Sequence, residues 1–141
     1  MRAEEEENMR YVPCWKQIGI SQDRYRELLH FCRQYPEWKT EANSLLGIRA
    51  IRADGLPHGS GKSDPVALAA EKRDSLMTKI GVVDECAKEI GSGEWYAAII
   101  QNVCIGRSWT QMDAALMPTR NKNAFFRMRR EFFKMLDKKI D

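Results

Sequence analysis

The chain of 141 residues is 43% hydrophobic and carries a formal net charge of +3. This size allows one domain, or two very small ones, with a modest core. The sequence has no apolar run of the roughly 18 residues that a transmembrane helix needs, and its first residues lack the pattern of a signal peptide. We therefore expect a cytoplasmic protein without a membrane partner.

The four cysteines stand singly in the sequence, at Cys14, Cys32, Cys86 and Cys104. They lack the paired spacing of a zinc motif, and no histidine lies where it would complete one. We therefore predict reduced thiols that are buried as small apolar side chains, and no bound metal.

The N-terminal part begins with an acidic segment, residues 1–10, which holds four consecutive glutamates. This segment is too polar to bury anything, and we predict that it is disordered. Residues 11–20 are expected to form an irregular segment that packs on the rest of the chain. Ser21 is a suitable N-cap for a helix that should end near Tyr35, and Pro36 fits the first turn of a second helix.

Residues 54–63 are rich in glycine, proline and serine, and they predict a flexible loop. Gly61-Lys62-Ser63 matches the closing part of a phosphate-binding loop. However, Leu56 occupies the position where that motif requires a glycine, and no strand precedes it. Nucleotide hydrolysis is therefore not predicted.

A long helix should follow this loop, because Asp64 and Pro65 are typical of the first positions of a helix. Its apolar stripe continues over roughly 26 residues, to Ile90, and so long an amphipathic helix needs a long partner. The two preceding helices, folded back across the loop, are the obvious partner. A second copy of the chain is the alternative.

Three further helices are predicted after the glycine-rich break at residues 91–93: residues 94–105, 109–116 and 119 to about 138. Gly106 should end the first of them. Thr119, which follows the break at Met117-Pro118, is the predicted N-cap of the last. This succession is typical of a helix-turn-helix unit. Because no segment shows strand alternation, the predicted fold class is all-α.

The last predicted helix has two unlike faces. Its apolar residues fall within half of a helical projection: Phe125, Phe126, Met128, Phe132, Phe133, Met135, Leu136 and Ile140. Its opposite side collects Arg120, Asn123, Arg127, Arg130, Lys134 and Lys138. From Gly106 onward the chain has nine lysines and arginines against four aspartates and glutamates. A merely solvated face usually mixes both signs of charge, whereas phosphate binding needs one, so this face predicts nucleic-acid binding.

Catalysis has little support in the sequence. Asp84, Glu85 and Glu89 lie along the long amphipathic helix with no histidine at ligand spacing, which indicates a solvated face. His30 and His58 have no visible nucleophile or carboxylate to work with. We therefore predict no enzyme activity, no catalytic residue and no cofactor.

The C-terminal helices carry a resemblance to known DNA-binding proteins. Residues 92–141 resemble region four of bacterial sigma factors, and the chain from about Tyr11 to Lys139 resembles the ArpU and RinA-like transcription regulators of phages and prophages of Gram-positive bacteria. The matching features are Tyr35-Pro36-Glu37-Trp38-Lys39, the glycine and serine loop that leads into Ser63-Asp64-Pro65, the long helix, and Phe125-Phe126-Arg127-Met128-Arg129-Arg130-Glu131-Phe132-Phe133.

This resemblance implies a DNA-binding regulator of transcription in the cytoplasm of a bacterial host cell. Its recognition positions fall on Thr119, Arg120, Asn123, Arg127 and Arg130. With the basic residues that can contact phosphates, the predicted DNA-binding set is Arg107, Thr119, Arg120, Lys122, Asn123, Arg127, Arg130 and Lys134.

Three regions are therefore predicted: an acidic lead at 1–10, a helical hairpin with a long helix at 11–91, and a helix-turn-helix DNA-binding unit at 92–141. Double-stranded DNA is the expected partner of the last region, and the middle region is expected to support homo-oligomer formation or contact with RNA polymerase. The alternative function is that of a phage terminase small-subunit-like packaging or assembly protein. Such proteins usually place the DNA-binding unit near the N-terminus, whereas here it comes last. A protein that only binds RNA polymerase is a third alternative.

Overall fold

The computed structural model of the protein describes residues 12–52 and 65–140, with side chains described for 12–47 and 65–140. All regular structure within these ranges is helical, which confirms the predicted all-α class. The elements are α2 (Cys14–Ile18), α3 (Gln22–Arg33), α4 (Tyr35–Arg52), α5 (Pro65–Glu89), α6 (Tyr96–Ile99), the π-helical η1 (Ile100–Ile105), the 3₁₀ turns η2 (Trp109–Gln111) and η3 (Ala114–Leu116), and α7 (Lys122–Lys139). The predicted acidic lead, the loop at 54–63 and the cap at Asp64 lie outside the described residues.

The first described residues differ in part from the prediction. Instead of an irregular segment, residues 14–18 form α2, which ends at Gly19 with a positive φ of 79°. As predicted, this segment packs on the body, where it contacts α3 and α7. Ser21 is confirmed as the N-cap of α3, because its hydroxyl accepts a hydrogen bond from the backbone N–H of Arg24 at 3.1 Å.

Helices α3 and α4 are separated by Gln34 alone, so they form one bent rod. The bend comes where Pro36 removes a backbone donor from the helical ladder, and the first residues of α4 restart that ladder with the bond from Trp38 N–H to the Gln34 carbonyl, at 2.9 Å. Pro36 therefore lies in the first turn of the second helix, as predicted.

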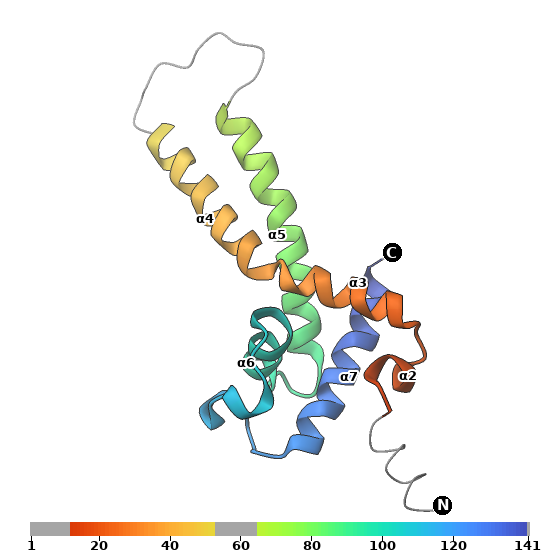
Figure 1. The fold of residues 1–141 in the computed structure, drawn as a ribbon. Helices are drawn as coiled ribbons and strands as arrows, with labels where there is room; N and C mark the ends of the chain where they lie inside the picture. The colour runs from red at the N-terminus through yellow and green to blue at the C-terminus, as the bar shows by residue number, and fades with distance from the viewer. Residues whose placement is uncertain (1–11, 53–64, 141) are drawn as a thin grey trace, which may run out of the picture.

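Helices α4 and α5 lie side by side as an extended hairpin, the arm, which projects from a body made of the other helices (Figure 1). Trp38 and Ala42 of α4 are buried, as are Leu76 and Ile80 of α5. This pairing confirms that the long helix has an intramolecular partner, but only α4 of the two predicted helices fills that role, because α3 packs mainly on η1 and α7. The lower part of α5 continues into the body, where it contacts α6 and α7.

The segment between α5 and α7 is less regular than predicted. Helical structure begins at Tyr96 rather than residue 94, but it does end at Gly106, which has a φ of 92°. The predicted helix over 109–116 is wrong, because η2 and η3 are single turns separated by Met112 and Asp113, both extended. Local side chains cause this: Ser108 and Gln111 close a capping box around η2, and Asp113 accepts a hydrogen bond from Ala115 N–H at 3.0 Å.

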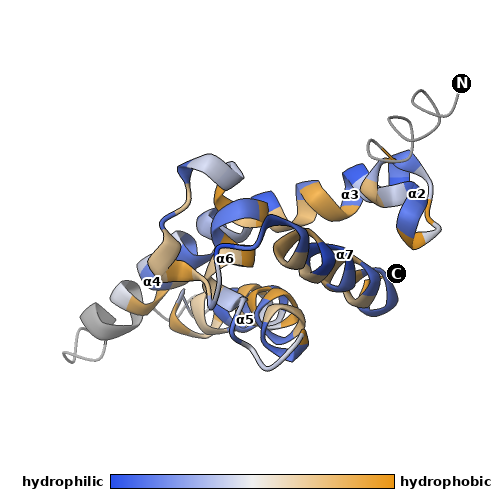
Figure 2. Cartoon of the chain, turned by 90° about the horizontal axis from the view of Figure 1, so that it is seen from below, coloured by the Kyte–Doolittle hydropathy of each residue, from blue (hydrophilic) through white to orange (hydrophobic). Residues whose placement is uncertain are grey.

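Helix α7 begins at Lys122, so the prediction of Thr119 as its N-cap is also wrong. The cap is Asn121, whose side-chain oxygen accepts a hydrogen bond from Ala124 N–H at 3.1 Å. The predicted apolar face is confirmed: Phe125, Phe132, Phe133 and Leu136 are buried, and Phe126, Met128, Met135 and Ile140 are half-buried against the same core. Figure 2 shows hydrophobic residues recurring along α3, α5 and α7 between hydrophilic ones.

A single hydrophobic core joins the regions predicted at 11–91 and 92–141. Buried residues from α3, α4, α5, η1 and α7 belong to one cluster. Across the predicted boundary, the rings of Tyr25 and Phe133 lie 5.0 Å apart. Neither region has a separate core of its own among the residues that the structure describes.

Candidate nucleic-acid interface

The surface side of α7 carries a row of basic residues that we call the cationic stripe: Arg127, Arg130, Lys134 and Lys138. All are exposed except Arg130, which is half-buried. Lys134 lies 3.9 Å from Glu131 in an exposed ion pair, which is too long and too solvated to neutralise it effectively. Within the described ranges, the side chains of Arg127, Arg130 and Lys138 form no ion pair or hydrogen bond. Their charges are therefore available to an anionic partner.

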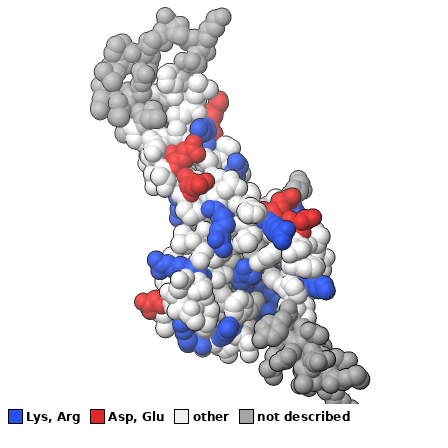
Figure 3. All heavy atoms as spheres, in the orientation of Figure 1, with Lys and Arg blue, Asp and Glu red and all other residues white. Residues whose placement is uncertain are grey.

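The stripe faces outward because the opposite side of α7 is fixed in the core. Phe132 and Phe133 are fully buried, and their rings stack edge to face at 5.4 Å. Residues three, four and seven apart lie on one helical face, so burying this pair together with Phe125 and Leu136 sets the rotation of the whole helix. Figure 3 shows several blue lysine and arginine side chains spread over the body among mostly white atoms, with red acidic side chains on the arm and at the edges of the body.

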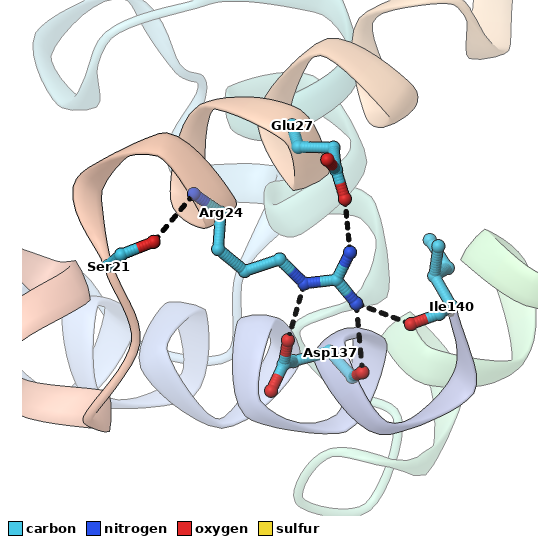
Figure 4. Close-up of polar contacts among 5 residues, drawn as sticks. All are labelled: Ser21, Arg24, Glu27, Asp137 and Ile140. Carbon is cyan, nitrogen blue, oxygen red and sulfur yellow. Dashed lines mark hydrogen bonds and ion pairs between the residues drawn. The ribbon is translucent and has the colours of Figure 1, made fainter.

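The C-terminal end of α7 is held by an arginine from α3 (Figure 4). Arg24 donates through Nε to the Asp137 carboxylate at 2.7 Å, and through Nη2 to the carbonyl oxygens of Asp137, at 3.2 Å, and of Ile140. These carbonyls belong to the last turn, where a helix has no internal donors to offer them. Lys139 adds ion pairs to Glu85 and Glu89 of α5, both at 3.4 Å. Asp137 and Lys139 at this end are thus engaged within the protein, whereas Lys138 belongs to the stripe.

Two of the predicted recognition residues do not lie on α7. Thr119 and Arg120 precede the helix, and the guanidinium of Arg120 turns back toward η2. It donates to the carbonyl oxygens of Met112, at 2.6 Å, and Trp109, at 3.2 Å, and it lies 4.7 Å from the centroid of the Trp109 ring. The prediction that Arg120 occupies the first turn of the last helix is therefore wrong. Its donors bind the irregular segment before α7.

Arg129 falls among the apolar residues on a helical projection of α7, and its side chain is also hydrogen-bonded within the protein. It donates to the Asn102 side chain and to the Tyr25 hydroxyl, each at 2.8 Å. Its guanidinium lies 4.9 Å from the centroid of the Phe133 ring. Arg129 therefore links α7 to η1 and α3, and it contributes to packing rather than to the stripe. Arg107 is exposed just after η1, apart from the stripe in sequence, and its backbone N–H donates to the Gln101 carbonyl at 3.0 Å.

Lys122 and Asn123 do occupy the first turn of α7, and both are exposed. They line a groove of about 560 Å³ between this turn and the N-terminal segment. The groove is also lined by Trp15 from α2 and by Phe126 and Arg130 from α7. Sequence reasoning missed the contribution of α2, because residues 11–20 were expected only to pack on the rest of the chain.

Acidic residues considered as metal or catalytic candidates have structural partners instead. Asp84 accepts hydrogen bonds from the hydroxyls of Tyr35, at 2.6 Å, and Tyr96, at 2.5 Å. Burial, together with the hydrogen bond to Asp84, raises the pKa of both tyrosines, so both stay protonated donors. Glu85 and Glu89 pair with Lys139. No group of metal-ligating side chains occurs in the described part of the chain, and no helix there has the length and apolar character to cross a membrane.

Comparisons of the chain with protein-family models, with curated proteins and with solved structures find no match. The resemblance to phage transcription regulators therefore stays a prediction that rests on the residues quoted for it.

Proposed function

We propose that this protein is a phage- or prophage-encoded transcription regulator that binds double-stranded DNA through α7. The observation that carries the proposal is the cationic stripe, a set of basic side chains on one outward face of a helix whose other face is fixed in the core. A phosphate backbone attracts such a face electrostatically, and an α-helix has the diameter to enter the major groove. The phage origin and the link to transcription rest on the sequence resemblance alone.

The role of individual residues follows from their place on α7. Asn123 is exposed in the first turn, and its amide can pair with an adenine edge, so we assign it to base recognition. Lys134 and Lys138 lie further along the helix and are assigned to phosphates. Arg120 is not assigned to a base, because its guanidinium is bound to the Met112 and Trp109 carbonyls.

The salt dependence of binding tests the proposal. With about four to six phosphate contacts from the stripe, Lys122 and Arg107, the logarithm of the affinity should fall against the logarithm of the salt concentration with a slope of about −4 to −5. Fluorescence anisotropy with labelled duplex DNA measures this slope. An affinity that does not change with salt concentration would contradict DNA binding through phosphate contacts.

A matched pair of variants separates the stripe from overall charge. The double variant Arg127→Gln with Lys134→Gln should reduce the slope by about 2, because it removes two phosphate contacts. The control is Arg26→Gln with Lys72→Gln, which changes the net charge equally. Its two residues are exposed on α3 and α5 and lie in ion pairs with Asp23, at 4.0 Å, and Glu41, at 2.7 Å. Equal loss of affinity in both double variants would mean that net charge, rather than α7, determines binding.

A role in phage packaging or assembly, like that of small terminase subunits, is favoured by a different observation. The arm exposes three large apolar side chains, Leu46, Leu68 and Met77, which are 45%, 53% and 41% exposed. Exposed apolar side chains on a projecting hairpin fit self-association or contact with another protein, RNA polymerase included. Light scattering coupled to size exclusion gives the mass in solution. A mass that corresponds to a ring of several copies, together with DNA binding that shows no sequence preference, would favour the packaging function over the regulator.

A further inference from the structure

The groove between α2 and α7 adds apolar and aromatic lining residues, which the proposed duplex interface does not use, to Lys122, Asn123 and Arg130, which it does. It is lined by both aliphatic and aromatic residues of the N-terminal segment and by one side of the first turns of α7: Val12, Pro13, Cys14, Trp15, Gln17, Tyr25, Lys122, Asn123, Phe126, Arg129 and Arg130. Its volume of about 560 Å³ is within the range of pockets that bind small organic molecules, roughly 300 to 1,000 Å³.

The charge of this groove is of one sign. Three basic side chains line it, and none of the described lining residues is acidic. The side chains of Lys122 and Arg130 make no ion pair or hydrogen bond to any described residue, whereas that of Arg129 is partly used by its bonds to Asn102 and Tyr25. The N-terminus of α7, an 18-residue helix, opens at the same place, so its helix dipole adds to the positive potential. An anionic group would therefore be stabilised at the Lys122 end.

Two aromatic side chains form walls of the groove. Trp15 and Phe126 are half-buried, and they come from two different helices, α2 and α7. The Phe126 ring also packs edge to face on Phe125, with the centroids 5.1 Å apart. Tyr25 is more fully engaged, because its ring packs on Phe133 and its hydroxyl accepts from Arg129. Lys16 lies 5.7 Å from the centroid of the Trp15 ring and brings a further cation to this wall. Aromatic rings beside cations are the combination that holds an unstacked base and its phosphate in proteins that bind single strands.

We propose that this groove binds one unstacked nucleotide of a nucleic-acid strand, with its phosphate at Lys122 and Arg130 and its base against Trp15 and Phe126. The inference rests on the proposed function, because it supposes that the protein meets nucleic acid. It adds a second subsite beside the duplex-binding stripe, and Arg130 and Asn123 lie at the border between the two. An unpaired or everted nucleotide next to the bound duplex is the ligand that fits both.

The test measures the full-length protein against three labelled probes: short oligo(dT), a fully paired duplex, and an acidic peptide of alternating glutamate and tyrosine. Trp15→Leu keeps apolar bulk but removes the indole, and it should weaken oligo(dT) binding about tenfold, the effect of losing one base stack, while duplex affinity changes less than twofold. Lys122→Gln, at an exposed position that does not threaten folding, should also weaken oligo(dT) binding. Lys72→Gln, on the arm, is the matched charge control and should leave it unchanged.

The possible results are distinct. Oligo(dT) binding that is unaffected by both Trp15→Leu and Lys122→Gln overturns the nucleotide site, even if duplex binding follows the stripe. Peptide binding that depends on Trp15, with no oligo(dT) binding, also overturns it and makes the groove a peptide site. If the wild-type protein binds oligo(dT) in a way that depends on Trp15 but does not bind the duplex, the proposed duplex-binding function is wrong and the nucleotide site stands.

Discussion

The Arg120→Ala variant should lose stability and keep its DNA affinity, although the sequence favoured this residue as a base reader. Its guanidinium forms two hydrogen bonds to backbone carbonyls and lies against the Trp109 ring. Because the side chain is exposed, water competes for these bonds, so we assign about 0.75 to 1 kcal/mol to each hydrogen bond and about 0.5 to 1 kcal/mol to the cation–π contact. The free energy of unfolding should therefore fall by about 2 to 3 kcal/mol.

This loss corresponds to a measurable change in melting temperature. An unfolding entropy of about 2.1 cal/mol/K per residue, over 141 residues, gives a decrease of about 7 to 10 °C. Circular dichroism measures the melt, and anisotropy well below the melting temperature measures DNA affinity. The control is Arg127→Ala, at an exposed position with no partner among the described residues, which should change stability by less than about 0.5 kcal/mol but weaken DNA binding. If Arg120→Ala alters base preference and leaves the melting temperature unchanged, its assignment to the packing of η2 is wrong.

Two further predictions concern α7. Asn123→Ala should reduce the discrimination between a preferred and a scrambled DNA site by about 1 to 3 kcal/mol, whereas Lys134→Ala should weaken binding to both sites alike. Equal weakening of binding to both sites by Asn123→Ala would exclude base reading by the first turn. Phe132→Ala, at a fully buried position, should lower the free energy of unfolding by about 3 to 5 kcal/mol. Because the arm and α7 share one core, unfolding followed by tryptophan fluorescence and by circular dichroism should show one common transition. Two separate unfolding transitions would contradict a single core.

The features predictable from the sequence were those that depend on local or periodic signals. The rotation of α7 followed from the spacing of its phenylalanines, since burying four apolar residues on one side leaves the helix no other orientation. Ser21 and Gly106 marked helix ends because a serine hydroxyl can accept from a free N–H group of the first turn, and glycine can adopt the positive φ that ends a helix.

The start of α7 could not be found in this way. Thr119 and Asn121 are both suitable N-caps, so local propensity does not choose between them. In the structure Arg120, which lies between them, is held against Trp109 and Met112, and this non-local contact keeps residues 119 and 120 out of the helix. The groove was missed for the same kind of reason, because α2 and α7 are far apart in sequence and only the tertiary fold brings them together.

The length of helix α5 determines how far the arm extends from the body. Its 25 residues form one continuous helix, which at 1.5 Å per residue is about 37 Å long. One end pairs with α4 in the arm, and the other contacts α7 in the body. A partner that binds the arm therefore fixes the distance and the direction of α7 relative to that partner. If two copies join through their arms, the length of α5 determines the separation of their reading helices, and with it the spacing between the two half-sites of the DNA they recognise.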